Sequence, residues 1–201
     1  MKVTSRAATL SDLDVVTRVM TTAFATDPVW GGWAFPDPDR DAANEQRRRF
    51  WEFCLRSGMR YPWLRMTDAG EAVALWFPPD STELTHEEEG QLEPLLRELV
   101  GGHAGAFLEG LELFEASHPR VEPHYYLSLL GTHDEYRGKG IGMALLRENL
   151  ELVDAKRLPA YLESTNDVNL GRYVSVGFER YGEFTLPAGG PTVTTMWRIA
   201  R

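Results

Sequence analysis

The chain has 201 residues, 43% of them hydrophobic and 25% charged, with a net charge of -9 at pH 7. The length fits a single domain over residues 1–201, and the composition excludes disordered and fibrous classes. The acidic balance argues against a nucleic-acid partner, because binding to a phosphate backbone requires a basic face. No apolar run approaches the ~18 residues of a membrane span, and residues 1–6 lack the apolar core of a signal peptide. We therefore expect a cytoplasmic protein with no membrane partner.

The first half of the chain predicts a strand, several helices and a hairpin. Thr9 and Asp12 have the spacing of a capping box before apolar residues that recur at helical intervals. The turn residues Asp68, Ala69 and Gly70 separate two strand-like runs. In order, we expect a strand at 3–8, a helix after the capping box, a loop at 30–39, a helix at 40–57, strands at 61–67 and 71–77, and two helices within 83–116 broken at Gly101 and Gly102.

The expected loop at 30–39 is rich in Gly, Pro and Trp. Loops with exposed aromatic side chains often border ligands. Trp30, Trp33 and Phe35 therefore have two interpretations, part of a substrate pocket or packing beneath the loop.

The second half alternates strand, helix, strand and helix before two closing strands. The run at 125–132 is almost continuously apolar, as expected for a strand covered on both faces. This order predicts a mixed sheet with helices on both faces. In order, we expect a strand at 125–132, a helix at 140–156, a strand at 160–164, a short helix at 169–176, and antiparallel strands at 178–186 and 192–199.

The turn from Arg137 to Gly142, Arg-Gly-Lys-Gly-Ile-Gly, stands between a strand and a helix. Its backbone N–H groups and the helix dipole predict an anion site, most naturally one for phosphate. A dinucleotide motif would need glycine at Met143. A Walker A loop would need glycine at His133 and Ser or Thr at Gly140. The pattern that fits is R-x-x-G-x-G, the pyrophosphate turn of acyl-coenzyme A transferases.

Three motifs in order resemble the general-control-type N-acetyltransferase (GNAT) superfamily over essentially the whole chain. They are Arg-Ala-Ala-Thr at 6–9 with Asp12, Tyr-Arg-Gly-Lys-Gly-Ile-Gly at 136–142, and Asn166 followed by Tyr-Val-Ser-Val-Gly-Phe at 173–178. The segments at 72–76, 122–123 and 158–164 are similar to the puromycin N-acetyltransferase branch.

The resemblance implies an α/β (α+β) GNAT fold, with a mixed central sheet of about six to seven strands. In that fold, two splayed parallel strands hold acyl-CoA through unpaired backbone groups. The resemblance also implies a backbone N–H near Leu130 that polarises the thioester carbonyl. The cofactor-binding residues that follow from it are Leu130, Gly131 and Thr132 for pantetheine, Arg137, Gly138, Lys139, Gly140, Ile141, Gly142 and Met143 for pyrophosphate, and Asn166 and Asn169, which cap the next helix or bond the cofactor.

By the same resemblance, Tyr173 is the general acid that protonates the leaving thiolate, with packing at a helix–strand junction as its alternative. Glu163 is the candidate that binds or deprotonates the amine, and its alternative is a buried acid paired with a cation. His124 is a minor candidate base. No metal is expected, because the five histidines show no metal-ligand spacing. Cys54 stands in an apolar helical pattern, which argues against a covalent acyl-enzyme.

The expected activity is acetyl transfer from acetyl-CoA to a primary amine of a small molecule, by direct attack in a ternary complex. The acceptor stays open among a puromycin-like aminonucleoside, another antibiotic, a metabolite amine, a polyamine and a peptide N-terminus. Two other classes also stay open: a non-catalytic acyl-CoA-binding sensor and a nucleotide-binding protein. The oligomeric state is a monomer or a homodimer.

Overall fold

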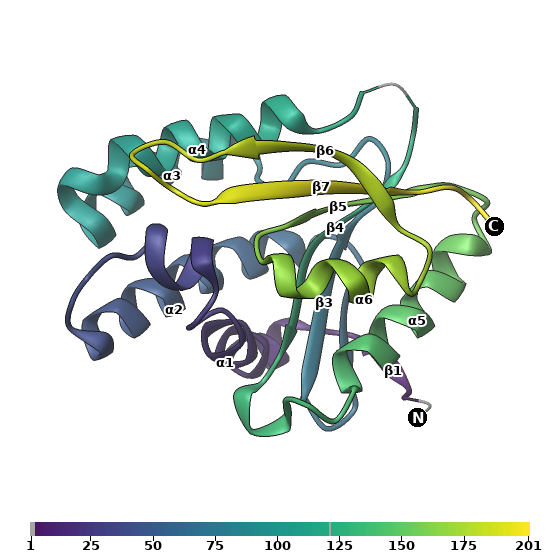
Figure 1. Ribbon diagram of the computed structural model, residues 1–201. Helices are drawn as coiled ribbons and strands as arrows, with labels where there is room; N and C mark the ends of the chain where they lie inside the picture. Colours follow the sequence, from purple (N-terminus) through teal and green to yellow (C-terminus); the bar gives the residue numbers. More distant parts are fainter. Residues whose placement is uncertain (1–2, 121) are drawn as a thin grey trace.

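The computed structural model describes residues 3–120 and 122–201 (Figure 1). Met1 and Lys2 of the N-terminal segment lie outside the described residues. Seven strands form one mixed sheet in the order β1-β2-β3-β4-β5-β7-β6, in which only β4 and β5 run parallel. The strands are β1 (Ser5–Ala7), β2 (Leu64–Thr67), β3 (Ala72–Phe77), β4 (Tyr125–Thr132), β5 (Ala160–Ser164), β6 (Glu179–Thr185) and β7 (Thr192–Arg198).

Helices cover both faces of this sheet (Figure 1). The first four pack on one face and the last two on the other. They are α1 (Leu13–Ala23), α2 (Arg40–Gly58), α3 (His86–Val100) and α4 (Ala104–Ser117), then α5 (Ile141–Asp154) and α6 (Leu170–Val174). Short 3-10 turns lie at Leu10–Asp12, Gly101–His103, Asp134–Tyr136 and Asp167–Asn169.

Strand β3 shows how the two layers are held together. All six of its residues are buried, and alternate side chains enter opposite cores because the side chains of a strand point to alternate faces. Full burial of each large apolar side chain contributes roughly 1.5–3 kcal/mol. Trp76 also donates its indole N–H to Oδ1 of Asn149 at 3.0 Å, which ties α5 to the sheet.

The segment predicted as a loop begins instead with a π-helix at Pro28–Trp33, so that part of the prediction is wrong. The Oδ1 atom of Asp27 accepts hydrogen bonds from the N–H groups of Val29 and Trp30, each at 3.0 Å. Proline at the first helical position and an aspartate cap both favour a helix start. Strand β2 starts at Leu64, later than predicted, because the chain turns after α2, where the N–H of Tyr61 bonds the carbonyl of Gly58.

The two parallel strands separate part-way along their length. Their pairing joins Tyr125–Leu127 to residues 160–162 and goes no further. Strand β4 continues to Thr132 against β3, and β5 continues to Ser164 against β7. The gap that opens between β4 and β5 is where the candidate functional site described below lies.

Candidate functional site

A groove of about 520 Å³ runs along the open edge of β4 and the start of α5. Its lining contains Tyr173 and all the predicted cofactor-binding residues except Lys139. These are Leu130, Gly131, Thr132, Arg137, Gly138, Gly140, Ile141, Gly142, Met143, Asn166 and Asn169. The structure therefore brings three separate segments of the sequence, 130–132, 137–143 and 166–173, to one surface.

The glycine turn at the groove has the backbone of an anion cradle. Gly138 and Gly140 have φ of 77° and 75°, and a Cβ added at either would meet nothing within 4 Å. No side chain caps the first turn of α5, so its N–H groups are open to a ligand. At Gly142 an added Cβ would lie 2.5 Å from Oγ1 of Thr132, so the turn packs directly on β4. These features fit the pyrophosphate of coenzyme A.

The cations near the turn have different placements. The Nη2 atom of Arg137 donates to the carbonyl oxygens of Thr22 and Ala23, each at 2.7 Å, which anchors the turn to the end of α1. Lys139 lies over the ring of Tyr136, 4.9 Å from its centroid, and does not line the groove. Arg137 thus lines the groove, and its guanidinium fixes the position of the turn.

The two asparagines have local roles beside the groove. Oδ1 of Asn166 accepts from the N–H of Val168 at 3.2 Å and caps the turn before α6, as one interpretation predicted. Oδ1 of Asn169 accepts from Nη1 of Arg172 at 2.8 Å. Arg172 also lines the groove, and the sequence analysis did not select this cation.

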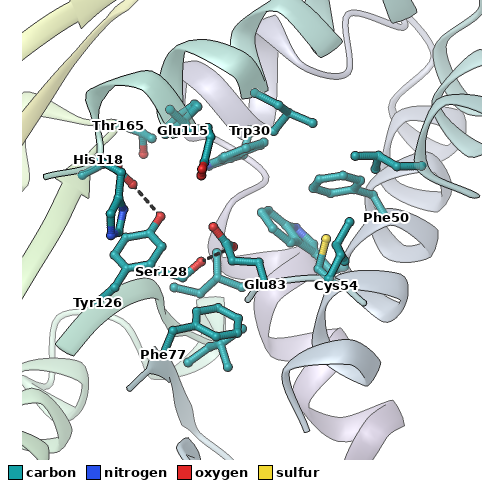
Figure 2. Close-up of a pocket in the computed structure, with 18 residues that line it drawn as sticks. Trp30, Phe50, Cys54, Phe77, Glu83, Glu115, His118, Tyr126, Ser128 and Thr165 are labelled. Carbon is teal, nitrogen blue, oxygen red and sulfur yellow. Dashed lines mark hydrogen bonds between the residues drawn. The ribbon is translucent and has the colours of Figure 1, made fainter. Parts of the chain in front are cut away.

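A second cavity, of about 190 Å³, lies on the helical side of the splayed strands (Figure 2). Aromatic side chains dominate its wall: Trp30, Phe50, Trp51, Phe77 and Phe114. Trp30 is thus pocket-lining, as one of its two interpretations predicted. Trp33 and Phe35 are outside the lining and pack in the core. Three carboxylates, from Glu83, Glu115 and Glu163, also face this cavity.

The gap between β4 and β5 joins the two spaces through a small cavity of about 40 Å³. Asp27, Leu130 and Tyr173 contribute to it from the groove, while Trp30 and Glu163 contribute from the aromatic cavity. The predicted acid and the predicted amine-binding residue therefore border the same junction from opposite sides.

Glu163 lies beside two tyrosine hydroxyl groups, those of Tyr126 and Tyr161, and both lower the pKa of its carboxyl. Its Oε2 accepts the hydroxyl hydrogen of Tyr126 at 2.5 Å, and its Oε1 is buried with no partner in residues 3–120 and 122–201. Burial raises the pKa of this carboxyl to about 8, although the bond from Tyr126 lowers it, and nearby Glu83 raises it further. No ion pair to Glu163 is found in that part of the chain, so the alternative of a salt-bridged acid is not observed.

Tyr173 keeps its proton at neutral pH. Burial, and then the charge of Asp27, raise the pKa of its phenol to about 12. Its ring also packs against Phe178 with centroids 6.2 Å apart. The residue thus combines a packed ring with a hydroxyl group in the groove lining, a geometry compatible with a general acid.

The sequence analysis missed Tyr126, Ser128 and Glu83. Tyr126 and Ser128 alternate along β4 on the face toward the cavity, a polar period of two that would have identified them. Glu83 lies in the connection after β3 and accepts from Oγ of Ser128 at 3.2 Å. It is solvent-accessible, yet the enclosing protein raises the pKa of its carboxyl to about 7.

A wider space of about 460 Å³ forms a vestibule outside the aromatic cavity, between the segment 77–83 and residues 118–120 and 122–124. His124 lines the vestibule but not the aromatic cavity, so it is set back from Glu163. Its Nδ1 donates to the carbonyl of Glu122 at 2.8 Å, and its Nε2 lies 3.0 Å from Nε2 of His118. Burial and His124 lower the pKa of His118 to about 4, so His118 is neutral at physiological pH.

Cys54 lines the aromatic cavity, where burial raises the pKa of its thiol well above the ordinary value. The thiol stays protonated and is a poor nucleophile. Within residues 3–120 and 122–201, no group of three or more His, Cys, Asp or Glu is placed to hold a metal ion. None of the helices described is both long and apolar enough to cross a membrane.

Comparison with known proteins identifies the family. A model described as the acetyltransferase (GNAT) family matches residues 43–178. The chain belongs to this family of acetyl-CoA-dependent N-acetyltransferases. It is 32% identical over 83 residues to the N-alpha-acetyltransferase RimI of Mycobacterium tuberculosis. The aligned residues make up 41% of this chain and 52% of that protein. The chain thus spans about half the length of this curated relative.

Solved structures agree with the fold. One is described as histone acetyltransferase HPA2 and related acetyltransferase from Corynebacterium glutamicum. It superposes with a TM-score of 0.68 at 25% identity, over 100% of this chain and 98% of that chain. The arylalkylamine N-acetyltransferase 2 of Aedes aegypti gives 0.61 at 15% identity over 100% of both chains. The predicted GNAT fold is confirmed, and the puromycin N-acetyltransferase branch stays a prediction.

Proposed function

We propose that the protein transfers an acetyl group from acetyl-CoA to a primary amine of a small molecule, by direct attack in a ternary complex. The observation that carries this proposal is the buried, unpartnered Oε1 of Glu163 at the junction of the two spaces. Buried polar atoms normally have hydrogen-bond partners, so this oxygen calls for one from a ligand. An ammonium group has three donors and satisfies it.

In this mechanism, Glu163 on one side of the junction accepts a proton, and Tyr173 on the other side donates one. Glu163 takes a proton from the ammonium, and a carboxyl pKa of about 8 suits a base that works near neutral pH. The amine nitrogen then bonds the thioester carbon as the carbon–sulfur bond breaks. Tyr173 gives its proton to the departing thiolate, and the protonated amide nitrogen then returns a proton to the tyrosinate, which leaves a neutral amide, a free thiol and one proton on Glu163 that passes to solvent. The backbone N–H near Leu130 supports the oxyanion that forms on attack.

The acceptor is a small molecule in this proposal because the carboxylate lies inside a cavity with aromatic walls. An aminonucleoside or another antibiotic amine, as the puromycin-branch resemblance implies, would place its larger part in the vestibule. The second candidate acceptor is a protein N-terminus, which the similarity to RimI favours.

Release of free thiol from acetyl-CoA tests the proposal. The panel contains arylalkylamines, polyamines, an aminonucleoside and peptides with a free N-terminus. We expect thiol release with at least one small amine, and a higher melting temperature with acetyl-CoA. A melting shift without thiol release for any amine or peptide would favour the non-catalytic binding module. Stabilisation by ATP or NAD but not by coenzyme A would favour a nucleotide-binding protein.

A further inference from the structure

The lining of the aromatic cavity divides into a polar opening and an apolar interior. The polar opening consists of the four polar residues that line both this cavity and the vestibule: Glu83, Glu115, His118 and Tyr126. The apolar interior consists of the lining residues that border neither the vestibule nor the junction. Apart from Cys54, all of these carry aromatic or aliphatic side chains, and they include Phe50, Trp51, Leu92, Leu111 and Phe114.

The acceptor of the proposed function does not fill this apolar interior. Its amino group lies at Glu163 beside the junction, and its larger part lies in the vestibule, so the acceptor follows the polar opening. The carboxylates of Glu83 and Glu115 there attract a cationic amine. Figure 2 shows Phe50 and Cys54 at the end of the cavity away from His118 and Tyr126. Because protein cores contain few voids larger than a water molecule, this apolar space calls for a second occupant.

Trp30 connects the apolar interior with the place where the donor reacts. It lines both the aromatic cavity and the junction. Its ring stacks on those of Phe50 and Phe114, with centroids 5.9 Å and 5.7 Å apart. In the proposed function the thioester of the donor lies at this junction, whose volume of about 40 Å³ has room for the methyl group of acetyl. The atoms of a longer acyl chain would continue past Trp30 into the apolar interior.

We infer that the apolar interior is an acyl pocket, and that the protein transfers acyl groups of about four to six carbons from their coenzyme A thioesters as well as acetyl. This inference rests on the proposed function and extends its donor. An apolar cavity of about 150 Å³ holds one benzene molecule, and the aromatic cavity measures about 190 Å³. The reaction has the balance of acetyl transfer. The amine nitrogen bonds the acyl carbon, the carbon–sulfur bond breaks, and acyl-CoA and an ammonium give an N-acyl amide, a free thiol and one proton.

A series of saturated acyl-CoA donors tests this inference on the unaltered protein. The series contains acetyl-, butyryl-, hexanoyl-, octanoyl- and decanoyl-CoA. We measure Kd by calorimetry without an acceptor, and kcat/KM from thiol release with an amine that accepts acetyl. Each buried methylene contributes about fourfold in affinity, so butyryl-CoA should bind about 15-fold more tightly than acetyl-CoA.

The longer donors show whether the pocket is confined. Hexanoyl-CoA should bind at least as tightly as butyryl-CoA, decanoyl-CoA should be poorer than hexanoyl-CoA because its chain exceeds the pocket, and kcat/KM should follow the same order. Tightest binding and fastest turnover with acetyl-CoA would overturn the inference. A steady rise in affinity up to decanoyl-CoA would indicate an unconfined apolar surface and would overturn it too.

Leu111→Ala assigns the chain-length preference to the apolar interior. The variant enlarges the cavity, so the ratio of kcat/KM for octanoyl-CoA to that for butyryl-CoA should rise by about fourfold. The matched control is Leu108→Ala, because Leu108 lies on the same helix, α4, and is also half-buried, but it does not line the cavity. An unchanged ratio in Leu111→Ala, or an equal rise in both variants, contradicts the assignment.

Failure of this inference differs from failure of the proposed function. Thiol release confined to acetyl-CoA, with no gain in affinity along the series, rejects the acyl pocket and leaves N-acetyl transfer standing. No thiol release from any of these donors with any acceptor rejects the proposed function, and acyl transfer with it.

Discussion

Tyr126 donates its hydroxyl hydrogen to Oε2 of Glu163 at 2.5 Å, and Oε1 of the same carboxylate is buried with no partner among the residues that the structure describes. The bond crosses from β4 to β5 just where their pairing ends at Leu127 and Leu162. One oxygen is therefore fixed to the protein at the place where the strands open. The other has no hydrogen bond among the described residues.

Glu163→Gln tests the base directly. Glutamine keeps the size of the side chain and accepts a bond from Tyr126, but it takes up no proton. We expect kcat/KM to fall by about 10²- to 10⁴-fold, with no change in the melting shift caused by acetyl-CoA. The control is Glu151→Gln on the exposed side of α5, which should retain full activity. Wild-type turnover in Glu163→Gln would make the carboxylate structural.

Tyr126→Phe tests the positioning role through the pH profile of kcat/KM. The hydroxyl bond lowers the pKa of Glu163, whose value is about 8 with the bond in place. The base acts when it is ionised, so activity declines as the pH falls through this pKa. Loss of the bond raises the pKa further, and the acidic limb should move to higher pH.

The matched control for that profile is Tyr125→Phe. Tyr125 is the preceding residue of β4 and belongs to the opposite core. Its profile should coincide with that of the unaltered protein. If the acidic limb stays in place in Tyr126→Phe while the rate alone falls, the hydroxyl contributes only to packing.

The sequence was most informative where the signal is local. The glycines of the turn and the apolar period of α5 each depend on neighbours a few residues away. These elements were predicted with bounds close to those of the structure. The turn itself could be predicted, because Gly138 and Gly140 have the positive φ that glycine adopts most easily.

Most of the lining of the aromatic cavity could not be predicted from the sequence. Its walls come from α2, β3, α4, β4 and the π-helix, and only tertiary packing brings these elements together. Glu83 lies in a connection without a motif, and the desolvation and the Glu115 charge that raise the pKa of its carboxyl both come from the folded chain. In the sequence, Trp51 looks like an ordinary core residue. Only the folded chain shows that its buried indole N–H has no hydrogen-bond partner among the described residues.

Tyr173→Phe tests the general acid. The variant keeps the ring that packs on Phe178 and loses the proton, so we expect kcat to fall by about 10²-fold with little effect on binding of acetyl-CoA. The pKa of Tyr173 is raised to about 12. The unaltered protein should therefore show no loss of activity from this group as the pH rises to about 10. Tyr181→Phe, at an exposed position of β6, is the control. An unchanged kcat in Tyr173→Phe would show that the thiolate leaves without this acid.

Gly142→Ala tests the contact between the turn and β4. The added methyl group would lie 2.5 Å from Oγ1 of Thr132, so the turn must shift, and such overpacking costs roughly 1–3 kcal/mol of stability. We expect a lower melting temperature and weaker binding of coenzyme A by calorimetry. Thr132→Ala removes the atom that clashes, so the double variant should regain much of both losses. Gly90→Ala in α3 is the control, because its new methyl group meets nothing within 4 Å and should stabilise the helix by roughly 0.5–1 kcal/mol. If the double variant is no better than Gly142→Ala alone, the glycine is required by the ligand and not by Thr132.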